Sequence, residues 1–347
     1  IGAAKKFEEV KHAGDFGIVV PEGEVTIDAG KLQAFKNDVV GKLTGGIRTL
    51  LKANKVEMMQ GTATLVDGHT VSVETEEGTK KITAESIVIA TGSSPIQIPN
   101  FDFSDGPVLD STKALDLSEI PEKMVVIGGG YIGLEMTGVY AKLGAQVTVV
   151  EMMDQVLPGF DPDVVKILKR RLKKDGVETL LKTKALGWEK ADKGIVVNVE
   201  TEKGEKKALE ADCVLVTVGR FPNTKGIGLE AAGIEMDGRF IKVDKQMRTN
   251  ISSVYAIGDV VGNPMLAHKA THEGEVVAEV IAGHKVQYDA RTVPAVVFTD
   301  PEVATAGLSE PECKEQGLNY KVGKVPWGAI GKAIANAETD GFVKVLI

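Results

Sequence analysis

The sequence has 347 residues, of which 26% are charged and 43% hydrophobic, with a formal net charge of -8 and a pI near 5.4. This composition is ordinary for a globular protein, and the length favours two or three domains. The acidic charge and the lack of an apolar run of membrane-spanning length argue against nucleic-acid binding and against a membrane-embedded chain.

The cysteines and histidines form no metal-binding pattern. Cys213 and Cys313 are too far apart for a CxxC or a zinc-ligand spacing. His268 and His272 are four residues apart, but no acidic or cysteine partner completes a plausible site. We therefore expect no metal site. Because the two cysteines form no such motif and nothing at the start resembles a signal peptide, we also expect a reducing, cytoplasmic setting.

The first part of the sequence predicts two helices and a small sheet. One helix is expected at residues 3–10. A second is indicated by apolar residues that recur every three or four positions and should pack on a larger body, namely Leu32, Phe35, Val39, Leu43, Ile47 and Leu50. Strand signals at 57–64, 70–75 and 80–84, separated by turn residues, predict an antiparallel meander.

A strand at 86–90 has the apolar character of a strand buried on both faces. It runs into Thr91-Gly92-Ser93-Ser94-Pro95, which by itself is only a strand followed by a turn. Residues 99–121 then form a segment that connects this part to the next domain.

A complete βαβ unit follows at residues 124–151. An apolar strand leads into the spacing G-x-G-x-x-G at Gly128, Gly130 and Gly133, and a helix and a second apolar strand follow. The first glycine permits a tight turn, the second a close approach of backbone to a pyrophosphate, and the third close packing of the helix. The helix N-terminus would bind the phosphates. The alternative is a loop that only turns the chain.

The second strand ends at Glu151, 23 positions after Gly128 (151 - 128). This offset is typical of the acid that binds the ribose 2′-OH of a dinucleotide. A carboxylate there accepts the hydroxyls of NAD and repels the 2′-phosphate of NADP. The unit therefore predicts an NAD site.

Beyond Glu151 the sequence predicts further helix and sheet. Asp161-Pro162 is a helix start and Gly176 a helix end. Cys213 is expected to be a small core residue, and 219–223 a turn that closes the sheet. Strands are expected at 177–181, 194–200 and 213–218.

The last part of the sequence begins with a short strand at 254–257, which ends at Gly258-Asp259, where ligands bind in open α/β sheets. A helix follows, with Val276, Val277, Val280 and Ile281 expected to face inward. A strand at 295–298 and a capping box at residues 309–312 come next. Strands are then expected at 320–325 and 342–347. The chain starts without methionine and stops in an apolar strand, so we expect a fragment lacking both ends.

Five motifs in one order resemble the two-dinucleotide flavoprotein disulfide reductases, and the dihydrolipoamide dehydrogenase branch most. The resemblance covers essentially the whole chain. The motifs are IVIATGSSPIQIP at 87–99, VVIGGGYIGLEM at 125–136, TVGRFPNT at 217–224, VYAIGDV at 254–260 and PMLAHKA at 264–270.

The resemblance implies an α/β fold in which a Rossmann-like NAD domain is inserted in an FAD domain, with the start of an α+β dimerisation domain. The implied limits are 1–120 and 248–288 for FAD-binding parts, 121–247 for the NAD domain and 289–347 for dimerisation. It implies NAD contacts at Gly128, Gly130, Tyr131, Ile132, Gly133, Glu135, Glu151, Ala185 and Gly219. It implies FAD contacts at Ala63, Thr91, Gly92, Ser93, Asp259, Met265, Leu266, Ala267 and His268.

The family's activity would be electron transfer between dihydrolipoyl groups and NAD, with the dihydrolipoyl domain of a 2-oxoacid dehydrogenase complex as partner and a homodimer as the assembly. Glu135 would shape the nicotinamide site by pairing with a lysine that this chain lacks; the alternative is an ordinary helix carboxylate. The family's CxxxxC pair, first G-x-G-x-x-G and His-Glu couple are also missing. We therefore expect no catalytic residue in this chain, no lipoamide reaction by these residues alone and weak FAD retention.

Two alternatives remain open from the sequence. The first is another reductase of this family, acting on glutathione, mercuric ion or coenzyme A disulfide; Glu151 argues against those that use NADPH. The second is a non-catalytic NAD-binding module.

Overall fold

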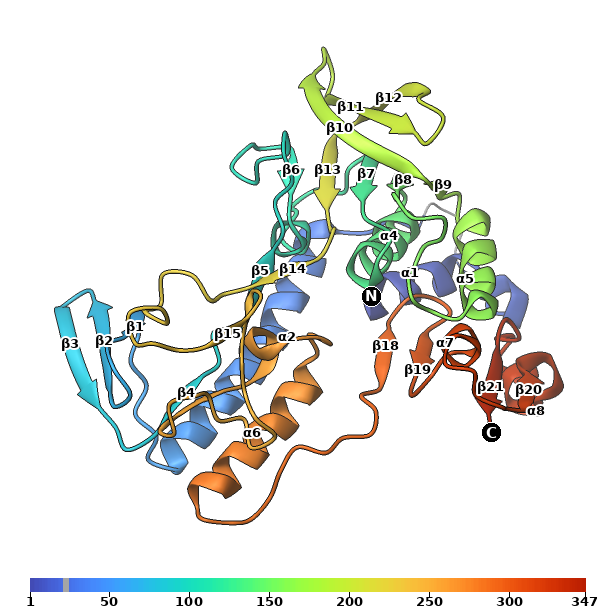
Figure 1. Cartoon of the computed structure of the whole chain (residues 1–347). Helices are drawn as coiled ribbons and strands as arrows, with labels where there is room; N and C mark the ends of the chain where they lie inside the picture. The colour runs from blue at the N-terminus through green and yellow to red at the C-terminus, as the bar shows by residue number, and fades with distance from the viewer. Residues whose placement is uncertain (21–24) are drawn as a thin grey trace. The chain divides into compact units, whose positions relative to one another are not determined.

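The computed structural model describes residues 1–20 and 25–347, which form two compact units (Figure 1). Each unit is built from segments far apart in the sequence. Unit 1 comprises Ile1–Lys42, Pro95–Gly219 and Pro294–Ile347. Unit 2 comprises Leu43–Ser94 and Arg220–Val293.

A five-stranded parallel sheet lies at the centre of unit 1. Its strand order is β6-β13-β7-β8-β9, which are Val108–Leu109, Cys213–Val216, Lys123–Ile127, Gln146–Val150 and Glu178–Leu180. The predicted βαβ unit is present, because α4 (Tyr131–Leu143) connects β7 to β8. Residues 124–127 of β7 are buried, as expected for a strand covered on both faces.

One face of this sheet packs against α4 and α5 (Pro162–Lys174). Leu134 and Tyr140 of α4 and Leu168 and Leu172 of α5 lie in the same buried cluster as Val126. The predicted helix start is confirmed, since Asp161 accepts the N–H of Asp163. These contacts fix where the loop between β7 and α4 lies.

A second sheet, which is antiparallel, packs against the other face of the parallel sheet. It consists of β10 (Thr183–Lys190), β11 (Ile195–Thr201) and β12 (Lys206–Ala211), and its apolar residues cluster with Val125 and Val214. The sequence analysis predicted only β11. Lysines and glutamates occupy most of the exposed positions of β10 and β12, so these strands lack a strong apolar signal.

Unit 1 also contains the first helix and the C-terminal segment. Phe7 of α1 (Gly2–Lys11) packs with Leu143 of α4. The segment 99–121, predicted as a connection, holds β6 and the short helix α3 (Ser111–Ala114). The C-terminal elements are β18 (Ala295–Val297), β19 (Val303–Thr305), α7 (Glu310–Glu315), β20 (Val322–Pro326), α8 (Gly331–Ala335) and β21 (Phe342–Leu346).

Unit 2 contains the predicted meander and a short parallel pair of strands. The meander is β1 (Thr62–Leu65), β2 (Thr70–Thr75) and β3 (Gly78–Thr83), so its first strand starts later than predicted. The parallel pair is β4 (Ile87–Ile89) with β17 (Val254–Ala256). The one-turn helix η2 (Gly258–Val261) follows β17, and α6 (Ala267–Ile281) comes next.

Three predictions about packing are wrong. Helix α2 (Ala29–Ala53) exists and Leu32 near its start packs on the cluster of Phe7 and Leu143, but most of its apolar stripe is exposed: Leu43 is 66% and Leu50 65% exposed. Ile281 was expected to face inward and is 46% exposed, because it lies at the end of α6. The turn at 219–223 does not close the sheet of unit 1, since β14 (Arg220–Pro222) pairs with β5 (Ser93–Pro95).

Candidate functional site

The turn between β7 and α4 depends on two glycines for its shape. Gly128 has φ +103, and a Cβ there would lie 2.5 Å from the carbonyl oxygen of Thr217. A Cβ on Gly133 would lie 2.1 Å from the carbonyl oxygen of Gly128, so α4 could not pack this close with a larger residue. The fold therefore requires glycine at both positions, for the tight turn at Gly128 and for the close packing of α4 at Gly133.

Gly130 differs from these two glycines. Apart from Gly130 itself and its chain neighbours, no described atom lies within 4 Å of the position where its Cβ would be, so space is open above its backbone. Gly130 is also the N-cap of α4, and Tyr131, Ile132 and Gly133 form the first turn. Helix N-termini present N–H groups and positive potential to anions. The open space and the helix terminus together fit a phosphate group.

The Glu151 carboxylate lies beside this loop. Its Oε2 accepts the N–H of Gly129 at 2.6 Å, and its Oε1 accepts the N–H of Met153 at 2.8 Å. The side chain is buried. A carboxylate has about four lone-pair sites, so two accepted bonds leave capacity for the hydroxyls of a sugar. The structure therefore brings together the loop and the acid that the spacing predicted.

The remaining residues predicted to contact NAD lie in other elements of unit 1. Gly219 follows β13 and accepts the N–H of Ile96 at 3.0 Å through its carbonyl. Ala185 lies in β10 beside a register shift. Thr217 was missed by the sequence analysis, although its hydroxyl donates to the carbonyls of Ile127 and Gly128 at 3.1 Å each. Its position directly after a strand of the parallel sheet is the signal that could have found it.

Glu135 on α4 is half-buried and has a different partner from the predicted lysine. Its Oε1 accepts the backbone N–H of Phe298 at 2.9 Å. Burial raises the pKa of the Glu135 carboxyl, although the Phe298 N–H and the amino group of Ile1 act in the opposite direction. The contact joins α4 to the residue after β18, which sequence spacing could not predict.

In unit 2, predicted flavin residues from two distant segments meet at Ser93. The Ser93 hydroxyl donates to Oδ2 of Asp259 at 2.5 Å. Arg220 donates through Nε to the Ser93 hydroxyl at 2.7 Å and through its terminal nitrogen to the Ser93 carbonyl at 2.5 Å. We call Ser93, Arg220 and Asp259 the Ser93 cluster. Arg220 was missed as a site residue because its motif was interpreted as a turn.

Asn223 fixes the segment that precedes Ser93. Its amide group donates to the carbonyl of Thr91 at 2.9 Å, and its backbone N–H donates to the carbonyl of Gly92 at 2.9 Å. The Thr91 hydroxyl donates in return to the carbonyl of Asn223 at 2.8 Å. The threonine and glycine predicted to lie near FAD are therefore held in a defined conformation.

The other predicted flavin residues lie in two further elements. Met265 precedes α6, Leu266 is its N-cap, and Ala267 and His268 start its first turn. A helix start of this kind offers backbone N–H groups to an acceptor. Ala63 lies in β1, opposite Val73 of β2, and so belongs to a different element from the Ser93 cluster. The side chains and helix terminus present here fit the polar parts of a flavin nucleotide.

The cysteines have the environment of core residues. Cys213 and Cys313 are both buried free thiols. Burial and the nearby charge of Asp212 raise the pKa of the Cys213 thiol to about 12, so it is a poor nucleophile at neutral pH. Among the described residues, no group of three or more His, Cys, Asp or Glu side chains could hold a metal ion. None of the described helices has the length and apolar character of a membrane span.

Comparison with known proteins identifies the class. Residues 2–274 match the model of the pyridine nucleotide-disulphide oxidoreductases, and residues 293–347 match the dimerisation domain of the same proteins. The chain therefore belongs to the pyridine nucleotide-disulphide oxidoreductase family. Within that family it is a homologue of the dihydrolipoyl dehydrogenases. It is 47% identical to those of Geobacillus stearothermophilus and Bacillus subtilis, over 100% of this chain and 73% of each relative.

Solved structures give the same fold. LpdA from Mycobacterium tuberculosis superposes with a TM-score of 0.90 at 27% identity, covering 99% of this chain and 75% of that one. The HOCl-induced flavoprotein disulfide reductase RclA from Escherichia coli gives 0.83 at 27% identity, covering 92% and 73%. The predicted fold class, a two-dinucleotide α/β flavoprotein with a dimerisation domain, is thereby confirmed. The assignments of single residues to NAD or FAD remain predictions.

Proposed function

We propose that the protein is an NAD-dependent FAD enzyme that oxidises dihydrolipoyl groups in a 2-oxoacid dehydrogenase complex, forming lipoyl groups and NADH. The observation that carries this proposal is the position of Glu151. Its carboxylate lies at the end of β8 and accepts the N–H of Gly129 in the glycine loop at 2.6 Å. A negative charge at that point favours a free ribose 2′-OH over a 2′-phosphate, and so NAD over NADP.

Each unit would bind a different cofactor. In unit 1 the loop from Gly128 to Gly133 would hold the pyrophosphate of NAD, and Glu151 the adenosine ribose. In unit 2 the Asp259 carboxylate would accept hydroxyls of the flavin side chain, and the start of α6 would direct N–H groups at the ring. Bound FAD would supply the two-electron chemistry that connects a dithiol to NAD. The predicted limits are 1–120 and 248–288 for FAD and 121–247 for NAD. They differ from the two units, because residues 1–42 and 95–120 belong to unit 1 and residues 220–247 to unit 2.

The proposed partners follow from the relatives and from the C-terminal match. Dihydrolipoyl dehydrogenases at 47% identity support a dihydrolipoyl domain as the substrate carrier. The match of residues 293–347 to a dimerisation domain supports a homodimer. Cys213 and Cys313 are buried, so the proposed dithiol chemistry needs a cysteine pair other than these.

The rival within the family is a reductase for another disulfide or for mercuric ion. The 47% identity to dihydrolipoyl dehydrogenases, against 27% to RclA, favours the dihydrolipoyl substrate. The rival from another class is a non-catalytic NAD-binding module. The hydrogen bonds that hold Asp259, Ser93 and Arg220 favour a second, flavin-binding role.

The decisive experiment is an assay of the full-length protein with dihydrolipoamide and NAD. We expect NADH formation, and a much slower reaction when NADP replaces NAD or when NADPH is offered with glutathione disulfide. Equal rates with NADP would refute the role of Glu151. A purified protein without flavin absorbance, and without FAD binding in a titration, would support the NAD-binding module instead.

A further inference from the structure

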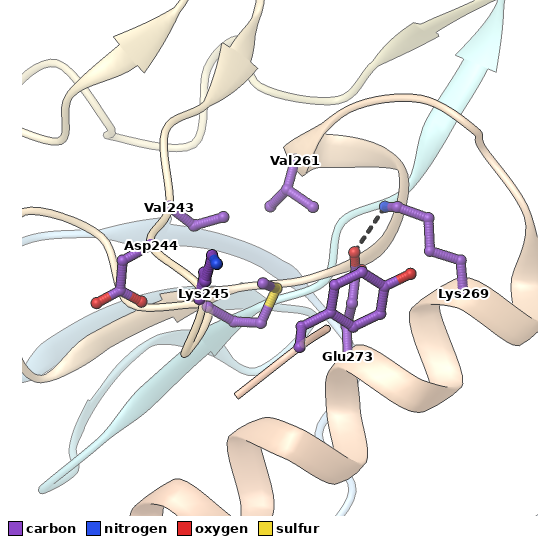
Figure 2. A pocket seen from close by; sticks show the side chains of 8 residues that line it. Val243, Asp244, Lys245, Val261, Lys269 and Glu273 are labelled. Carbon is purple, nitrogen blue, oxygen red and sulfur yellow. Dashed lines mark ion pairs between the residues drawn. The ribbon is translucent and has the colours of Figure 1, made fainter. Parts of the chain in front are cut away.

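Helix α6 contains a buried ion pair, which Figure 2 shows at the wall of a pocket. Nζ of Lys269 lies 2.7 Å from Oε1 of Glu273, one helical turn further on. The side chains are only 8% and 2% exposed. Burying two charges is costly unless further hydrogen bonds compensate. The hydrogen bonds that Lys269 and Glu273 make to other residues therefore indicate what the pair does.

Those partners belong to the turn after β17. The second carboxylate oxygen of Glu273, Oε2, accepts the backbone N–H of Gly258 at 2.7 Å. Nζ of Lys269 lies 3.5 Å from the carbonyl oxygen of Gly258 and 3.4 Å from that of Gly262. The pair thus contacts the start of η2 and the residue that follows its end. Gly258 adopts φ +77, and its Cβ position is 3.2 Å from the Cβ of Ala270, so this turn is seated directly on α6.

Asp259 lies within the turn that the pair holds. On one side, its carboxylate accepts the Ser93 hydroxyl at 2.5 Å; on the other, its neighbour Gly258 is bound by Glu273. A charged acceptor for the Gly258 N–H restrains the backbone that sets the direction of the Asp259 side chain. The Ser93 contact restrains the side chain of Asp259, and the Glu273 contact restrains the backbone directly before it.

We propose that Lys269 and Glu273 are positioning residues for flavin binding: together they fix the Gly258–Gly262 turn so that Asp259 meets the hydroxylated side chain of FAD. This proposal rests on the proposed FAD site. The pair acts through the turn and does not itself touch the cofactor. Its contribution is to keep the Asp259 carboxylate in one orientation before the cofactor arrives.

The pocket beside the pair determines how the test variants are chosen. It has a volume of about 480 Å³, and Figure 2 labels Val243, Asp244, Lys245 and Val261 around the pair. A shortened side chain would let water enter from this pocket and would confuse the outcome. Removing one charge would strand the other in a buried position. Both problems are avoided by replacing the two residues together with side chains of similar length.

The experiment compares Lys269→Met/Glu273→Gln with Lys269→Met/Glu273→Met. Both remove the ion pair, but only glutamine keeps an acceptor oxygen for Gly258. We expect FAD titrations to give at least about tenfold weaker binding for the Met/Met variant than for the wild type, and an intermediate affinity for the Met/Gln variant. Amide hydrogen exchange at residues 258–262 of the flavin-free protein should rise in the same order.

The control is Lys142→Met/Asp300→Asn, which removes a partly buried ion pair of unit 1 and should leave FAD affinity unchanged. A pair that only stabilises the fold would lower the melting temperature of both test variants with equal FAD affinity and equal exchange; that result overturns the proposal. If the Met/Met variant does not fold, the Met/Gln variant decides by comparison with the wild type. Weaker FAD binding and faster exchange at residues 258–262 support the proposal, and wild-type values for both refute it.

The two proposals fail in different ways. All FAD titrations use the full-length protein, and if the full-length wild type binds no FAD, the proposed flavin site is wrong. The exchange rates at residues 258–262 still show whether the pair holds the turn. If the wild type binds FAD and all variants bind it equally, only the positioning role is wrong.

Discussion

The two candidate cofactor sites are built in different ways. The dinucleotide loop of unit 1 and its acid lie in one continuous βαβ unit, from β7 to Glu151. The Ser93 cluster of unit 2 joins Ser93, Arg220 and Asp259. Ser93 and Arg220 alone are more than a hundred positions apart in the sequence. The first site is shaped by backbone and by the absence of side chains at glycines. The second is shaped by side-chain hydrogen bonds.

This difference predicts how each site can be broken. A site shaped by glycines is damaged by adding atoms, because its backbone segments are already in contact. A site shaped by side-chain hydrogen bonds is damaged by removing atoms, because each lost partner leaves a polar group unsatisfied.

The largest effect is expected for Gly133→Ala in unit 1. The new Cβ would meet the carbonyl oxygen of Gly128 at 2.1 Å and the Thr217 hydroxyl at 2.6 Å, so α4 must move away from the sheet. We expect the free energy of unfolding to fall by about 1–3 kcal/mol or more, with loss of NAD binding. Urea denaturation and calorimetric titration with NAD measure the two effects.

The matched control for this variant is Gly130→Ala. No described atom lies within 4 Å of the new methyl group, so the free energy of unfolding should change by less than about 1 kcal/mol. NAD binding should still weaken by about tenfold, or ~1.4 kcal/mol, because the methyl group would occupy the space needed by the pyrophosphate. Unchanged NAD affinity in Gly130→Ala would contradict the assignment of the loop.

The next effect is expected for Glu151→Arg. Loss of a charged acceptor should weaken NADH binding by about 1.5–3 kcal/mol and ease NADPH binding. The structure adds a cost that the sequence did not reveal. The carboxylate accepts the N–H groups of Gly129 and Met153, so arginine also removes two acceptors from a buried position and should lower stability.

Glu151→Gln separates these two consequences. Its amide oxygen keeps one acceptor and the shape of the side chain, so stability should be closer to that of the wild type. NADH affinity should still fall, because the charge is gone. Fluorescence titrations with NADH and NADPH, run beside thermal unfolding, test both statements. Equal affinities of the wild type and both variants for NADH would exclude a ribose contact.

The contrast between the two sites also explains what could be predicted from the sequence. The loop, its helix and the acid follow from spacing, because neighbouring residues in one βαβ unit can only be arranged in a few ways. Thr217 could not be placed beside the loop in this way, because its contact with Gly128 crosses 89 positions (217 - 128). The family resemblance named Ser93 and Asp259 but gave no reason for Arg220 to bind Ser93, or for Lys269 and Glu273 to contact the turn that begins at Gly258.

Packing was the other part that periodicity could not supply. A repeat of three or four residues predicted α2 correctly, yet it contains no information about what covers the stripe, and Phe35 is 60% exposed. The strands β10 and β12 were missed because their exposed faces carry charged residues. Their pairing with β11 becomes evident only when Ile195, Val197 and Val199 are seen to cover the parallel sheet.

An effect of similar size on cofactor affinity is expected when side chains of the Ser93 cluster are changed. Asp259→Asn keeps the shape of the side chain and removes its charge, so FAD binding should weaken by about 1.5–3 kcal/mol. Ser93→Ala removes one hydrogen-bond partner of Asp259 and should weaken it by about 1 kcal/mol. Flavin absorbance of the purified proteins and FAD titration give both values. Full flavin occupancy in the purified Asp259→Asn variant would show that Asp259 does not contribute to FAD binding.

The smallest effect concerns the pH dependence of unit 1, which side-chain charges also help to hold together. Burial alone would raise the pKa of the Asp300 carboxyl, but the hydrogen bond from Lys142 and the charge of Arg171 lower it below its usual value of 3.8. A carboxyl group whose pKa is lowered by folding stabilises the folded state above its unfolded pKa. This contribution is fully present at neutral pH and is lost as the pH falls from 3.8 through the folded pKa.

Asp300→Asn should therefore reduce the stability of the protein at pH 7 and flatten the loss of stability in acid. Urea denaturation at a series of pH values down to about 3 measures the free energy of unfolding of both proteins.

The control is Asp116→Asn, which breaks an ion pair with Lys36 in which the aspartate is 66% exposed. Surface pairs of this kind contribute little, so the control should follow the wild type at every pH. An acid profile of Asp300→Asn identical to that of the wild type would show that Lys142 and Arg171 do not hold this carboxylate in solution. The side-chain contacts of unit 1 would then matter less than its backbone packing.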